Sequence, residues 1–99
     1  MISFKEINWW VPDDTKSFEK ELKKELSSKH PLYSKRRKLK GVAKASYDDD
    51  VLFTDEEKYY MVHLSWGERE KSAKLPYYEE YPNLEAFHNA IKEKQQGQR

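Results

Sequence analysis

The pattern of apolar and polar positions predicts an antiparallel sheet in the middle of the chain. Residues 39–47 alternate apolar side chains with polar ones, and a short apolar run follows at 51–54. The apolar positions of the first segment carry mostly small side chains, namely Leu39, Gly41, Ala43, Ala45 and Tyr47. The segment 59–66 is rich in aromatic and branched residues, with Tyr60, Val62, Leu64 and Trp66 on one face. Since the charged segment 55–58 separates the last two runs, we expect a hairpin, and the three consecutive strands predict an antiparallel meander. The second face of 59–66 is amphipathic, so we also expect this segment to be central to the sheet.

Helical spacing of apolar residues predicts one helix before this sheet and one after it. The first runs over about 16–28, follows the helix-start residues 13–15, and carries an apolar stripe of Phe18, Leu22 and Leu26. The second follows Asn83, a typical N-cap, and runs to about residue 94 with Leu84, Phe87, His88 and Ile91 at helical spacing. We expect both helices to cover the same face of the sheet.

These elements together predict one α+β domain over residues 1–96, with residues 97–99 as a frayed tail. In this fold an N-terminal and a C-terminal helix cover an antiparallel meander of three or four strands. Residues 2–12 fit either a short strand or an ordered arm packed on the core. The segment 76–82 is aromatic but bracketed by prolines, and we expect an extended edge segment there at most.

The composition is that of a small folded domain with a hydrophilic shell. Charged residues make up 37% of the 99 residues, against about 25% in typical domains, so the core must be small. Aromatic residues at 14% supply large buried surfaces and argue against a disordered chain. The chain has no cysteine, which excludes disulfides and thiolate metal sites. With no run of 18 apolar residues and no secretory signal pattern, we expect a cytoplasmic protein without a membrane partner.

Three motifs resemble those of a known family. They are His30-Pro31-Leu32-Tyr33, Asp49-Asp50-Val51-Leu52-Phe53 and Val62-His63-Leu64-Ser65-Trp66. With Glu21-Leu22 before them and Pro82-Asn83-Leu84-Glu85-Ala86-Phe87 after, the chain resembles, over about residues 18–88, a family of small uncharacterised bacterial proteins. The family's motifs read HPLY, DDVLF and VHLTW, and Ser65 stands at the threonine position. The resemblance implies a single-domain cytoplasmic bacterial protein, and it implies no catalytic residue because the family has no established activity.

A surplus of aromatic residues outside the main strands predicts a protein-binding surface. Tyrosine and tryptophan are the usual anchors of interfaces, and the candidates are Trp9, Trp10, Tyr77, Tyr78 and Tyr81. Glu79 and Glu80 among them favour a basic partner. The alternative is that these rings close a small core. A protein-binding or accessory module is nevertheless the function that the sequence favours, with the partner and the oligomeric state left open.

The most basic window of the chain indicates nucleic-acid binding as the alternative function. Clustered cations contact phosphates, and this window contains Lys35, Arg36, Arg37, Lys38 and Lys40. The simpler interpretation is a solvated edge strand that lysines protect from pairing with other chains. No nucleic-acid-binding motif accompanies the window, and the net charge of the whole chain is only +1.

A third hypothesis is a metal-dependent enzyme. Divalent metals take clustered histidine and carboxylate ligands, and the candidates are His30, His63 and His88 with Asp48, Asp49 or Asp50. No His-x-x-x-His or His-Glu-x-x-His spacing brings the histidines together, and core histidines are the simpler interpretation. We therefore assign no metal ligand and no cofactor. Without a cysteine or a Gly-x-Ser-x-Gly elbow, nucleophilic catalysis has no support, and the sequence favours a protein that is not an enzyme.

Overall fold

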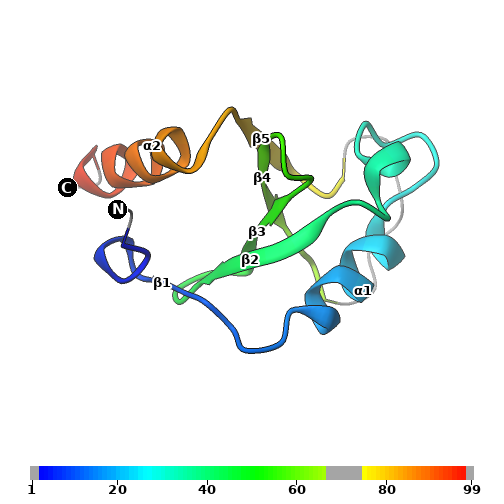
Figure 1. The fold of residues 1–99 in the computed structure, drawn as a ribbon, viewed down its shortest axis with the longest axis horizontal. Coiled ribbons are helices and arrows are strands. Elements are labelled where there is room, and N and C mark those ends of the chain that lie inside the picture. Colours follow the sequence, from blue (N-terminus) through cyan, green and yellow to red (C-terminus); the bar gives the residue numbers. More distant parts are fainter. Residues whose placement is uncertain (1–2, 67–74, 98–99) are drawn as a thin grey trace.

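The computed structural model describes residues 3–66 and 75–97 and has a five-stranded antiparallel sheet at its centre (Figure 1). The strands follow the chain order, so the sheet is a meander: β1 (Trp9–Trp10), β2 (Lys40–Ala45), β3 (Asp50–Thr54), β4 (Tyr59–His63) and β5 (Tyr78–Tyr81). The predicted α+β class and meander are confirmed. The sheet has more strands than expected because β1 and β5 extend it at both edges. Strand β3 is therefore the middle strand, and β4 lies inside the sheet between β3 and β5.

Two α-helices accompany the sheet: α1 (Lys16–Glu25) and α2 (Leu84–Gly97). Before α1, the Asp14 side chain accepts a hydrogen bond from the backbone N–H of Lys16 at 2.9 Å. Asn83 caps α2 as predicted, since its Oδ1 accepts from the Ala86 N–H at 2.8 Å. The short 3₁₀ helices η1 (Lys5–Ile7) and η2 (Tyr33–Lys35) complete the described elements. No helix within these described ranges is long and apolar enough to cross a membrane.

The expectation that both helices cover one face of the sheet is wrong. Helix α1 packs with Phe18, Leu22 and Leu26 on one face, against Val51, Phe53, Tyr60 and Val62. Helix α2 packs with Phe87 and Ile91 on the other face, against Leu52 and Met61. Figure 1 shows the two helices on opposite sides of the strands. The physical reason is that β3 and β4 are apolar on both faces, so each face needs a cover.

The predicted single apolar face of residues 39–47 is also wrong, because β2 carries an irregularity at Val42. Gly41 lies opposite Phe53, whereas Ala43 lies opposite Leu52, so the register shifts between them. Gly41 therefore faces α1 and Ala43 faces α2. A Cβ atom on Gly41 would lie 2.7 Å from the Cβ of Thr15, so the close approach of this helix end requires a glycine.

The N-terminal segment is both an arm and a strand. Strand β1 pairs with β2, placing Trp9 opposite Ala45, and both side chains are buried on the α2 face. The side-chain amide of Gln95 donates to the Ile7 carbonyl at 2.7 Å, which ties the segment to α2. The core on this face is thus closed by residues from both ends of the chain.

Candidate functional site

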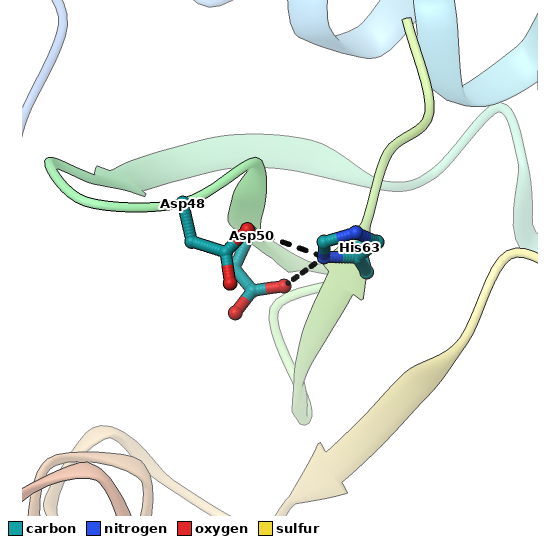
Figure 2. Close-up of side chains that lie close together, drawn as sticks. All are labelled: Asp48, Asp50 and His63. Carbon is teal, nitrogen blue, oxygen red and sulfur yellow. Dashed lines mark hydrogen bonds and ion pairs between the residues drawn. The ribbon is translucent and has the colours of Figure 1, made fainter. Parts of the chain in front are cut away.

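Asp50 and His63 lie directly opposite each other in the β3–β4 ladder. They continue the face of Leu52 and Met61, so they lie on the α2 side of the sheet but beyond its apolar patch. The Nδ1 atom of His63 is 2.9 Å from Oδ1 of Asp50 and 3.7 Å from Oδ1 of Asp48. Figure 2 shows both carboxylates directed at one edge of the imidazole ring. We call these three residues the Asp–Asp–His cluster.

Hydrogen bonds to backbone groups hold each segment of the cluster in place. The ammonium of Lys44 donates to the Asp48 carbonyl at 2.8 Å, and the Asp49 N–H donates to the Asp48 side chain at 2.7 Å. At the end of β4, the N–H of His63 donates to the carbonyl of Tyr77 at 2.9 Å. The cluster is therefore held from the β2–β3 turn, the β3–β4 ladder and the entry to β5, and it needs no rearrangement to form.

The two carboxylates of the cluster repel each other. Burial raises the pKa of Asp50 above its usual range, the charge of Asp48 raises it further, and the hydrogen bond from His63 opposes both effects. The side chain of Asp50 is 19% exposed, while those of Asp48 and His63 are more open. A positive charge placed between the carboxylates would relieve this repulsion.

The cluster has the dimensions of a metal site. One ligating atom from each residue lies within 4.8 Å of the other two. Ligand atoms bound about 2.0–2.2 Å from one ion lie roughly 3–4.3 Å from one another. The separations of His63 Nδ1 from the Asp50 and Asp48 carboxylates, 2.9 and 3.7 Å, need little adjustment to reach that range.

The other predicted metal ligands lie elsewhere. His30 is buried, and both of its ring nitrogens form hydrogen bonds within the protein. Its Nδ1 accepts from the Leu32 N–H at 3.0 Å, and its Nε2 donates to the Pro76 carbonyl at 2.9 Å, so its role is structural. His88 is buried on α2, and its Nε2 has no hydrogen-bond partner among the described residues. The structure thus gathers one histidine and two of the three candidate aspartates.

Two neighbouring hollows extend from the cluster along β5. The first has a volume of about 160 Å³ and is lined by Asp50, Met61, His63, Tyr77, Tyr78, Glu79 and Lys94. The second has a volume of about 690 Å³ and is lined by Glu79, Glu80, Tyr81, Ala90, Glu93 and Lys94. Because they share Glu79 and Lys94, we treat them together and call them the β5 groove. Its lining contains four carboxylates against one lysine.

The five predicted protein-binding residues do not form one patch. Trp9 and Tyr81 are core residues, packed edge-on against Phe87 with ring centroids 5.0 and 5.5 Å away. Trp10 is 47% exposed, but it lies on β1, at the opposite edge of the sheet from β5. Tyr77, 75% exposed, and Tyr78, half-buried, both line the β5 groove.

Two cations of the predicted nucleic-acid-binding window, Lys35 and Arg36, contact other side chains of the protein. Lys35 forms an ion pair with Asp55 at 3.1 Å and lies over the ring of Tyr60. The guanidinium of Arg36 stacks on the ring of Tyr33 at 3.8 Å. The remaining members, Arg37, Lys38 and Lys40, are exposed. The binding role of this window stays a prediction, and two of its five cations have structural partners.

Sequence reasoning missed a second pair of carboxyl groups, Glu21 and Glu25 on α1. Both are buried, and the Glu25 carboxylate accepts the backbone N–H groups of Ser65 at 2.9 Å and Trp66 at 3.0 Å. A hydrogen bond with Glu25, together with burial, raises the pKa of Glu21 to about 7. The sequence feature that could have indicated this pair is two glutamates at i,i+4 spacing beside the apolar stripe of the helix.

None of the protein-family models, curated proteins or solved structures compared with the chain matches it. The resemblance to a bacterial family therefore stays a prediction.

Proposed function

We propose that the protein binds a divalent transition-metal ion through Asp48, Asp50 and His63. The observation that carries the proposal is the convergence of two carboxylates and one imidazole from three segments, with their ligating atoms within 4.8 Å of one another. The ion replaces the hydrogen-bond proton between His63 Nδ1 and Asp50 Oδ1. Its positive charge offsets the repulsion between the two aspartates.

The ligand set favours some ions over others. Imidazole with carboxylate suits zinc, manganese, iron, cobalt and nickel, whereas magnesium and calcium prefer oxygen ligands alone. Copper(I) prefers sulfur ligands, and the chain has no cysteine. Three protein ligands leave coordination positions for water, and the 160 Å³ hollow beside Asp50 and His63 gives those positions room.

Calorimetric titration with zinc chloride tests the affinity, with Asp50→Asn and His63→Ala as the site variants. Asp49→Asn is the matched control, because it makes the same chemical change in the same turn, at an exposed residue outside the cluster. We expect saturable binding of one ion that the site variants abolish and the control preserves. Equal affinity in all four proteins would refute the proposal.

A second readout does not depend on how well the variants fold. In the unmodified protein, substoichiometric manganese broadens the amide signals nearest to the bound ion. We expect the signals of Asp48, Asp50 and His63 to disappear first. Earlier loss at other carboxylates, such as Glu56 and Glu57, would place the ion elsewhere and contradict the proposal.

We further propose the cytoplasm of a bacterium as the setting of this function. The support is the resemblance of the three sequence motifs to a bacterial family, together with a chain free of cysteine, as suits a compartment where disulfides do not persist. Fractionation of bacterial cells that express the protein measures this directly, and recovery from the cell envelope would contradict it.

A further inference from the structure

No described strand pairs with the outer edge of β5. Strand β5 is the last strand of the sheet and pairs with β4 on one side. The His63 N–H bonds to the Tyr77 carbonyl, and hydrogen-bonded pairs alternate along an antiparallel ladder. Residues 77, 79 and 81 therefore direct their backbone groups toward β4, whereas Tyr78 and Glu80 direct theirs toward the open edge.

The side chains around this edge carry a negative charge. The carboxylates of Asp50, Glu79, Glu80 and Glu93 line the β5 groove, with Lys94 as the opposing lysine. Glu79 stays ionised, because hydrogen bonds from Tyr81 and Lys94 hold its pKa below the usual range. Glu93 has no partner among the described residues.

The existing ion pairs of the groove leave room for a competing cation. Lys94 contacts Glu79 at 3.1 Å and Lys58 contacts Glu80 at 2.9 Å, and all four side chains are about half exposed. Exposed pairs of this kind contribute little to stability, so a partner's cations can replace the lysines at little cost. The ring of Tyr77 stands exposed beside the first hollow and offers a cation–π surface.

We infer that the β5 groove binds an extended, lysine- or arginine-rich segment of a partner protein, which pairs with Tyr78 and Glu80 as an additional strand. Strand addition supplies the backbone hydrogen bonds, and the groove supplies the charge complementarity. A nucleic acid is disfavoured because its phosphates would face four carboxylates. Pairing of two β5 edges is disfavoured because Glu79 and Glu80 of each copy would face those of the other.

Defined peptides test the inference. The probe is a fluorescein-labelled decapeptide in which lysine alternates with valine. One control peptide replaces lysine with glutamate, and another replaces four valines with proline, which removes strand-forming N–H groups. We expect anisotropy to report binding of the first peptide alone, with an affinity that falls as salt rises. Equal binding of the proline peptide would overturn strand addition.

Variants of the protein locate the binding surface. The double variant Glu79→Gln with Glu93→Gln removes two charges from the groove and leaves the Asp–Asp–His cluster intact. Asp13→Asn, an exposed change before α1, is the control. We expect about tenfold weaker peptide binding for the double variant and no change for the control. Unchanged peptide affinity in the double variant would overturn the inference, whatever the result of the metal titration.

Hydrogen exchange supplies the decisive readout. Bound peptide is expected to slow exchange of the Tyr78 and Glu80 amides in the wild-type protein, because those amides then donate to the added strand. Binding without this protection would overturn the proposed pairing. Protection of the same amides without peptide, rising with protein concentration, would identify a second copy as the occupant, and preferential binding of a labelled oligothymidine would identify a nucleic acid; either result would overturn the inference.

Discussion

Replacing Glu21 by glutamine should stabilise the protein by an amount that grows as pH rises from about 4.5 to about 7. Glu21 and Glu25 are both buried on α1, and the Glu25 carboxylate is committed to the backbone N–H groups of Ser65 and Trp66. The Glu21 carboxyl therefore keeps its proton and donates it to Glu25, which with burial raises its pKa to about 7. Glutamine donates the same hydrogen bond from its amide and never ionises.

The sign and size follow from the pKa difference between folded and unfolded chains. Between about pH 4.5 and 7 the folded protein holds a proton that the unfolded chain has released, so its stability falls as pH rises through this window. At 1.36 kcal/mol per pKa unit, the full change corresponds to at most about 3 kcal/mol. Because water reaches the edge of the pair and screens the repulsion, we expect about 1–2 kcal/mol.

Urea unfolding of both proteins at pH 5, 6, 7 and 8.5 measures the effect. The two free energies of unfolding should differ least at pH 5, and the advantage of the variant should grow through pH 7 to about 1–2 kcal/mol at pH 8.5. Glu57→Gln, an exposed change in the β3–β4 turn, should leave the pH dependence unaltered. A difference that stays constant with pH, or that favours the wild type as pH rises, would refute the shared proton.

Four further outcomes follow from particular contacts. Gly41→Ala should lower the free energy of unfolding by about 1–3 kcal/mol in urea titrations, because the added methyl collides with the residue that precedes α1. Trp9→Ala should cost about 3–5 kcal/mol and Trp10→Ala less than about 1 kcal/mol in the same assay, since one ring is buried against α2 and the other is exposed. Asp55, although buried, accepts backbone and side-chain hydrogen bonds that hold its pKa below the usual range; its stabilisation should disappear as pH falls below about 4, and Asp55→Asn should flatten the acid limb of the stability profile. Zinc at about 100 times its Kd should raise the Tm by roughly 10–20 °C, an effect that EDTA reverses and that His63→Ala lacks.

Local sequence patterns were sufficient to predict the two α-helices and the strands β2, β3 and β4, although not all of their bounds. The apolar run at 51–54 and the alternation at 59–66 predicted β3 and β4, and the cap at Asn83 predicted the start of α2. These patterns were not sufficient to place the helices, because an apolar strand face does not identify which helix covers it. The irregularity at Val42 reverses the faces of β2 midway. Gly41 was the available signal, because a glycine inside a strand often marks a bulge.

Only part of the Asp–Asp–His cluster could be predicted from the sequence. A four-residue connection between Thr54 and Tyr59 fixes the hairpin register and places Asp50 opposite His63, so this pairing was available from turn length alone. The approach of Asp48 depends on the conformation of the β2–β3 turn, which Lys44 stabilises through two backbone carbonyls. Such contacts arise from tertiary structure and leave no spacing motif.

The place of the cluster within the sheet is itself an argument for function. Along β3 the α2 face changes from Leu52 to Asp50, and along β4 it changes from Met61 to His63, so both strands turn polar at the same level. Two adjacent aspartates with Asp50 partly buried work against stability, as the raised pKa of Asp50 indicates. Positions where a sequence departs from the choice that best stabilises its fold are where binding sites are expected. On the opposite face of the sheet, the neighbouring positions on β3 and β4 stay apolar: Val51 and Val62 are fully buried beneath α1.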